Sequence, residues 1–282
     1  MVTIQNEMLT VRIAELGAEL KSIRCGDTEY IYPSESAIWD KSAPILFPIT
    51  GSVKNDTYTH KGKTYHMGKH GFAQYLPYEV EELSQERAVF LLRESEQTLA
   101  QYPFAFCLRV IYELRENSLI TTYAVDNRSD EVMYFSVGAH EGYYTPEGIE
   151  DYDILFDEPV TLDHTVLYGP LVTELRTRML TEGCVLPMYE KFFASDALVF
   201  EKIPVHTLTF RNRKNARAVR VDFPFADNLL LWHMPNAPYL CIEPWAGIPD
   251  RVGSGSELCD KEGILSLAPN ARYLGTHTIT IL

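Results

Sequence analysis

Basic residues are scarce in this sequence of 282 residues: 25 lysines and arginines stand against 39 aspartates and glutamates, which gives a net charge of −14 at pH 7. Nucleic acids and anionic membranes attract basic patches, so neither is expected as a partner. Long apolar runs are also missing, and none approaches the length of about 18 residues that a membrane-spanning helix needs. The first residues carry neither the basic nor the apolar block of a signal peptide. We therefore expect a cytoplasmic protein.

Cysteine is infrequent, and its five copies form no pair with the spacing of metal ligands. The number is odd and most copies lie among apolar neighbours, which is typical of buried free thiols in a reducing compartment. Histidines offer no better metal site. A β-hairpin does not readily bring His60, His66 and His70 together, and no carboxylate or cysteine shares their spacing. We expect neither a metal nor a cofactor.

Two motifs of well-known enzyme classes are absent as well. The nucleophile elbow Gly-x-Ser-x-Gly does not occur, because the sequence Gly253–Ser256 is followed by Glu257 instead of glycine. No glycine-rich phosphate loop precedes a helix. Neither a serine hydrolase nor a nucleotide-binding protein is indicated.

The sequence does contain many short segments that favour β-strands. Aromatic residues make up 12% of the chain, which favours strands. Polar and apolar residues alternate at 9–13, and hairpins are predicted at 58–66, 80–94 and 104–125. A short helix is predicted at 95–102, with a serine cap at its start and a proline after its end.

About eighteen short strands and almost no long helices predict an all-β protein, a large antiparallel β-sandwich. We expect one domain over residues 1–282. Two prolines in the apolar run within 39–58 argue against a central strand there, so this segment is expected to be a loop or an edge that lines a cleft. The strands between 152 and 175 are expected to be short, with breaks at 157–159 and 169–170.

The segment around which the chain is organised is Cys241–Gly247, Cys-Ile-Glu-Pro-Trp-Ala-Gly. Its Glu243 follows an apolar run, where a carboxylate is costly to bury unless a partner binds it. Burial also raises the pKa of a carboxyl, as a general base requires. Trp245 offers a flat apolar surface that suits a sugar ring, and Pro244 is expected to end regular strand pairing. The alternative is a strand-end glutamate paired with a lysine or arginine.

Two histidines have the sequence context of exposed functional groups. His70 has glycines on both sides in Gly-Lys-His-Gly-Phe-Ala, and His140 ends an apolar strand in Ser-Val-Gly-Ala-His-Glu-Gly-Tyr. Each could instead be a histidine without a role, His140 as a core residue that bonds a backbone carbonyl. Together with Glu243, however, they form a set that can move protons on a neutral sugar, in which a carboxylate takes a proton from one oxygen while an imidazole donates to another.

Five segments along the chain resemble motifs of one known family, the aldose 1-epimerase (galactose mutarotase) superfamily, and within it the LacX-like branch. They occur in this order: Ala43–Ile49, His70–Ala73, Gly138–His140, Cys241–Trp245 and Lys261–Leu265. The resemblance covers nearly the whole chain. It implies the antiparallel supersandwich fold of the galactose mutarotases and the interconversion of the α and β anomers of an aldose.

The resemblance also implies a role for each group of the set. Glu243 would be the general base that takes the proton of the C1 hydroxyl, and His140 the general acid that protonates the ring oxygen. His70 would hydrogen-bond the substrate. No metal or cofactor is implied, and the partner would be a small-molecule sugar. Further substrate contacts are expected from five side chains, the aromatic ones by stacking: Gln74, Asp196, Phe72, Trp245 and Tyr143.

The sequence departs from the branch at several positions. Ser52 and Gln74 stand where arginines are common, and Glu141–Tyr143 replaces a Pro-Ala-Phe segment. The missing arginines and the net charge of −14 argue against a sugar phosphate. Three cations could compensate: Lys54, Lys69 and Arg251.

Two alternatives to a mutarotase of neutral sugars therefore stay open. One is a carbohydrate-binding or sugar-sensing protein that has the fold without the catalysis. The other is a hexose-6-phosphate 1-epimerase. The sequence does not choose between a monomer and a homodimer.

Overall fold

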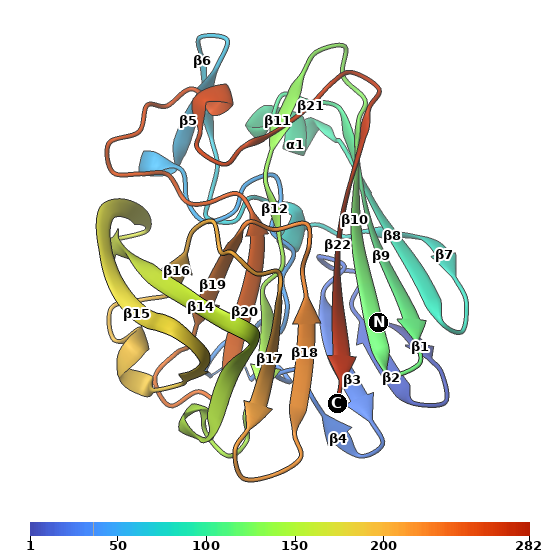
Figure 1. The fold of residues 1–282 in the computed structure, drawn as a ribbon. Helices are drawn as coiled ribbons and strands as arrows, with labels where there is room; N and C mark the ends of the chain where they lie inside the picture. Colours follow the sequence, from blue (N-terminus) through green and yellow to red (C-terminus); the bar gives the residue numbers. More distant parts are fainter. Residues whose placement is uncertain (36) are drawn as a thin grey trace.

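The computed structural model describes residues 1–35 and 37–282, and antiparallel β-sheets dominate it (Figure 1). The largest sheet has 14 strands in the order β12-β20-β19-β16-β14-β17-β18-β22-β10-β9-β8-β7, with β13 also paired to β20 and β15 to β14. Its strands are β7 (Glu79–Leu83), β8 (Arg87–Arg93), β9 (Phe106–Arg115), β10 (Ser118–Asn127), β12 (Val137–Gly138), β13 (Glu141–Tyr144), β14 (Tyr152–Tyr168), β15 (Leu171–Pro187), β16 (Leu198–Phe200), β17 (Thr207–Asn212), β18 (Ala218–Asp222), β19 (Asn228–Trp232), β20 (Tyr239–Ala246) and β22 (Arg272–Ile281).

Smaller sheets complete the described structure. They are formed by β1 (Val2–Gln5), β2 (Leu9–Ile13), β3 (Leu20–Cys25) and β4 (Thr28–Glu29), by β5 (Thr57–His60) with β6 (Lys63–His66), and by β11 (Met133–Phe135) with β21 (Leu265–Leu267). One cluster of buried apolar side chains joins the four-stranded sheet to the large sheet, and it includes Val11 and Ile23 from the former and Phe90 and Val110 from the latter. The predicted all-β antiparallel fold is confirmed.

Most local predictions are confirmed. The helix α1 (Glu96–Gln101) begins after Ser95, whose hydroxyl accepts a hydrogen bond from the Thr98 amide at 3.3 Å. The apolar, proline-containing segment 39–53 forms isolated bridges instead of a named strand. Among the described residues, no helix is long and apolar enough to cross a bilayer.

The expected break at 157–159 is wrong. Strands β14 and β15 are each 17 residues long, and their register shifts between Leu155 and Val160, where a bulge accommodates Pro159. A bulged residue needs no ladder hydrogen bond, so a proline there does not end the strand. The break at 169–170 is confirmed as the turn between the two strands.

Pro244 does not end strand pairing either, because β20 continues to Ala246. The proline lies opposite Ala139, in the gap between β12 and β13, and its carbonyl accepts a hydrogen bond from the Ala139 amide at 3.1 Å. A regular ladder would return a bond from residue 244 to the Ala139 carbonyl, which a proline cannot donate. The indole of Trp245 donates to that carbonyl instead, at 3.1 Å.

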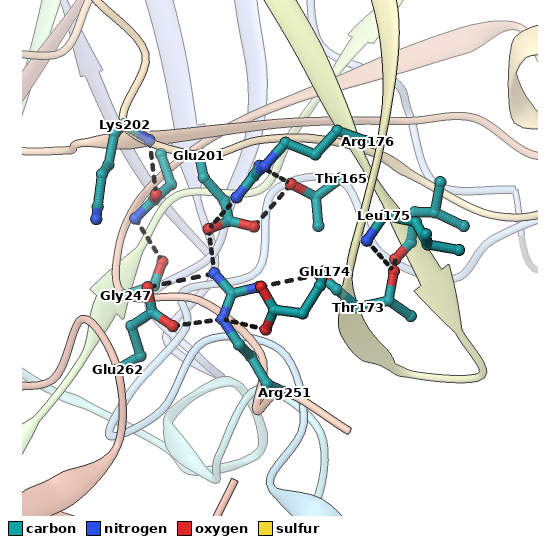
Figure 2. Close-up of polar contacts among 12 residues, drawn as sticks. Thr165, Thr173, Glu174, Leu175, Arg176, Glu201, Lys202, Gly247, Arg251 and Glu262 are labelled. Atoms are coloured by element: carbon teal, nitrogen blue, oxygen red, sulfur yellow. Dashed lines mark hydrogen bonds and ion pairs between the residues drawn. The ribbon is translucent and has the colours of Figure 1, made fainter. Parts of the chain in front are cut away.

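The tip of the long β14–β15 hairpin is held by an ion-pair network that Figure 2 shows in detail. The Arg251 guanidinium donates to the Glu201 carboxylate at 2.6 Å and to the Thr173 carbonyl at 3.0 Å. Thr165 donates to the other oxygen of Glu201 at 2.7 Å. The backbone adds bonds between Val172 and the segment around Arg251. The hairpin tip is thereby tied to residues far from it in the sequence.

We predict that Arg251→Met loosens this tip. The Glu201 carboxylate is 4% exposed, and losing its main partner should lower the free energy of unfolding by about 1–3 kcal/mol. Hydrogen exchange at the Val172 amide should become faster. Arg178→Met is the matched control, because the Arg178–Asp163 pair lies on the same hairpin in solvent and should matter little. Equal effects of the two substitutions would contradict this account of the network.

Candidate active site

The site lies on one face of the large sheet, along a row of residues from neighbouring strands. Glu243 of β20 pairs with Leu230 of β19 on one side. On its other side it faces His140, which lies between β12 and β13 in the same register. The two side chains meet, with His140 Nε2 3.3 Å from Glu243 Oε2. Both are buried, at 8% and 2% exposure.

His70 reaches the same place from a loop with a constrained backbone. Its φ is 67° and that of Gly71 is 70°, and a Cβ on Gly71 would lie 2.3 Å from the Phe47 carbonyl oxygen. Only glycine fits there. The His70 amide donates to the Gly51 carbonyl at 2.7 Å, and the Gly51 amide donates to His70 Nδ1 at 3.1 Å. Because Nδ1 accepts a bond, the proton of the neutral ring is on Nε2, which leaves a hydrogen-bond donor.

Burial shifts the pKa of all three groups against their charged forms. It raises the pKa of Glu243 well above its usual value, although the nearby Lys69 acts in the opposite direction. Burial, assisted by Lys69, lowers the pKa of His140 to about 3. The pKa of His70 is lowered well below its usual value by burial, by His140 and by Lys69. The site therefore favours a neutral imidazole that faces a neutral carboxyl.

These groups lie in a cavity of about 270 Å³, near the small end of the range for ligand pockets. All three tryptophans of the chain line it, namely Trp39, Trp232 and Trp245. The Trp39 and His140 rings are 5.3 Å apart. A small cavity with aromatic walls and a few convergent polar groups suits a ligand the size of one sugar ring.

Most of the residues predicted from the sequence are brought together here. The cavity is lined by Glu243, His140, His70, Gln74, Asp196 and Trp245. Asp196 has a φ of 148°, which is rare for a residue with a side chain. Its carboxylate accepts a bond from the Ala197 amide at 2.8 Å.

The prediction that Phe72 and Tyr143 contact the substrate is corrected, since neither is among the described residues that line the cavity. Tyr143 is three residues from His140 on an extended segment, so its side chain points to the opposite face of the sheet, where it packs near Phe210. Phe72 is 5% exposed and packs among core aromatics that include Phe47. Neither ring is therefore placed to stack on a ligand in this cavity.

Of the three cations considered as substitutes for the missing arginines, only Lys69 lines the cavity. Lys54 donates to the Val252 carbonyl at 2.9 Å, and Arg251 belongs to the network at the hairpin tip. Ser52 is 2% exposed and is not among the described lining residues. Gln74, which like Ser52 stands where an arginine is common in the branch, does line the cavity.

Several lining residues were missed by sequence reasoning. They include Trp39, Asp40, Lys41, Leu167, Pro170 and Trp232. Trp39 had a usable signal, because it opens the segment expected to line a cleft. Leu167 and Pro170 had none, since only the fold places the tip of the β14–β15 hairpin beside the sheet face. The same site also offers three possible metal ligands, His140, Cys241 and Glu243, within 4.8 Å of one another.

Comparison with known proteins gives one consistent result. Protein LacX, chromosomal, of Lactococcus lactis subsp. lactis is 31% identical over 299 residues, which cover 100% of this chain and 99% of that protein. A galactose mutarotase related enzyme from Lactobacillus acidophilus has a similar structure, with a TM-score of 0.93, 36% identity and coverage of 100% and 97%.

A galactose mutarotase-like protein from Lactobacillus casei ATCC 334 matches with a TM-score of 0.91, 26% identity and full coverage of both chains, 100% each. Galactose 1-epimerase from Lactobacillus acidophilus NCFM shares the fold, with a TM-score of 0.75, 14% identity and coverage of 99% and 93%. Residues 1–252 match the family described as aldose 1-epimerase. The chain belongs to the aldose 1-epimerase family.

Proposed function

We propose that this protein is a mutarotase that interconverts the α and β anomers of a neutral aldose. The observation that carries the proposal is the contact of 3.3 Å between His140 and Glu243 at the cavity wall. A carboxyl and an imidazole at this separation can act on two oxygens of one small ring, and the ring oxygen and the C1 hydroxyl of a pyranose are such a pair.

In the proposed reaction, Glu243 as carboxylate takes the proton of the C1 hydroxyl while His140 as imidazolium protonates the ring oxygen. The bond between C1 and the ring oxygen breaks and leaves an open-chain aldehyde. Rotation about the C1–C2 bond presents the other face of the aldehyde, and the two proton transfers then run in reverse. The proton count is balanced, because the pair holds one proton before the ring opens and one proton after it.

The burial of the pair suits this sequence of steps. After ring opening the pair is a neutral carboxyl and a neutral imidazole, which is the state that burial favours. The open-chain stage thus coincides with the least costly charge state of the site. His70 Nε2 supplies a donor for a substrate oxygen, and the tryptophans cover the apolar faces of the ring.

The charges around the cavity favour a neutral sugar over a sugar phosphate. Lys41 and Lys69 line the cavity together with Asp40 and Asp196, so the lining cations are matched by anions. The net charge of −14 adds a field that opposes an anionic substrate.

We predict that Glu243→Gln lowers kcat by about 10²–10⁴-fold, because the amide cannot accept the proton. The substitution keeps the size of the side chain, so sugar binding should persist. Anomer exchange measured by NMR gives the rate. The fluorescence of the three cavity tryptophans, titrated with the same sugar, gives the affinity.

A wild-type protein that binds sugars but accelerates exchange of none in a broad aldose panel would contradict the proposal. That outcome would favour the carbohydrate-binding alternative.

A second prediction concerns substrate charge. Anomer exchange of a neutral aldose should have a higher kcat/KM than that of its 6-phosphate, and Lys69→Met should leave the order unchanged. Kinetics of both sugars with both proteins provide the check. Faster exchange of the phosphate, abolished in Lys69→Met, would instead identify a hexose-6-phosphate epimerase.

A further inference from the structure

Cys241 is a buried thiol that the proposed reaction does not use, and it lies beside the two groups that the reaction does use. It is 0% exposed and lies on β20 two residues from Glu243, on the same face of the strand. His140, Cys241 and Glu243 each offer one ligand atom, and the three atoms lie within 4.8 Å of one another. No other group of three such residues was found at this separation in the described part of the chain.

These three ligand types are those of zinc. Sites with three protein ligands keep a fourth position open, with bonds of about 2.0–2.2 Å to nitrogen and oxygen and about 2.3 Å to sulfur. Such bonds place a nitrogen and an oxygen about 3.4 Å apart on a tetrahedral ion. The observed separation of His140 Nε2 from Glu243 Oε2 is 3.3 Å, so the pair needs little movement to share a metal.

Charge also favours a divalent cation here. Thiolate and carboxylate together carry two negative charges and the imidazole carries none, so the complex with Zn²⁺ is neutral. The thiol and carboxyl protons leave to solvent when the metal binds. Burial disfavours the charged form of each group alone. A complex with no net charge is disfavoured less. His140 and Glu243 line the cavity, so a metal that they share would lie at its wall.

We propose that His140, Cys241 and Glu243 form an inhibitory site for Zn²⁺ or Co²⁺ inside the cavity. A bound metal occupies the lone pairs of Glu243 and His140 that the proton transfers require, so metal binding and turnover exclude each other. The inhibition rests on the proposed function, whereas metal binding does not.

Cobalt is the probe, because a thiolate bound to Co²⁺ gives a charge-transfer absorption band that a carboxylate or an imidazole does not give. All proteins carry Cys259→Ser, which removes the exposed thiol beside Asp260. Titration with Co²⁺ should produce the band in this parent protein, and Zn²⁺ should abolish it. The band should be absent in Cys241→Ala and in the isosteric Cys241→Ser.

The second measurement is anomer exchange with increasing Zn²⁺. The parent should be inhibited. The Zn²⁺ concentration that gives half-maximal inhibition should be at least about tenfold higher in Cys241→Ala. Loss of a residue that only supports a metal ligand already weakens metal binding about tenfold or more, and loss of a ligand should cost no less. Without metal, the Cys241 variants should keep the parent rate.

A parent without the band, or an equal band in the Cys241 variants, would overturn the proposal. If Cys241→Ala fails to fold, as judged by circular dichroism, Cys241→Ser decides. If the parent shows the cobalt band but no exchange with any aldose, the metal site stands and the proposed function fails.

Discussion

The site depends on one constraint: a carboxyl and an imidazole are buried against each other. Glu243 and His140 are 2% and 8% exposed, and Nδ1 of His140 has no hydrogen-bond partner in the described residues. Two ionisable groups in such a place are stable only while their charges cancel. In the proposed reaction the pair acts as a unit that holds one proton, and the surrounding sheet must keep the two residues in register for that unit to exist.

The register of His140 and Glu243 depends on an irregularity of the sheet, the gap between strands β12 and β13. The gap between β12 and β13 leaves Ala139 and His140 opposite Pro244 and Glu243. The proline cannot bond the Ala139 carbonyl, and the indole of Trp245 takes its place. This indole hydrogen bond thus has two effects. It holds the gap between β12 and β13, where His140 lies, and it orients the Trp245 ring that lines the cavity. A residue with an amide proton at 244 would compete for the same carbonyl.

The sequence allowed the fold class to be predicted, and it pointed to candidate residues that the structure brings together, because the signals for both are local. Strand alternation and turn residues gave the sheets, and glycine or proline beside His70 and Glu243 gave the candidates. Geometry across strands was less accessible. The prediction that Tyr143 lines the site was wrong because the segment after His140 stays extended, and side chains along an extended segment alternate between the two faces of the sheet. The strand break predicted at 157–159 was wrong because a bulge and a turn can have the same composition. Leu167 was missed because its place beside the cavity depends on partners of the hairpin tip, such as Arg251, that lie far away in the sequence.

The charge of the molecule and the charge of the cavity support the same proposed substrate class, a neutral sugar, for different reasons. A net charge of −14 repels anions at long range, where salt screens it. Inside the cavity, Lys69 stands near Glu243 and Asp196, so its charge is used to moderate the carboxyl pKa. A phosphate would have to draw Lys69 away from that role, which would raise the pKa of Glu243 further and weaken it as a carboxylate base. A neutral sugar makes no such demand, because its hydroxyls can be bound by neutral donors such as His70 and Gln74 while Lys69 keeps its place.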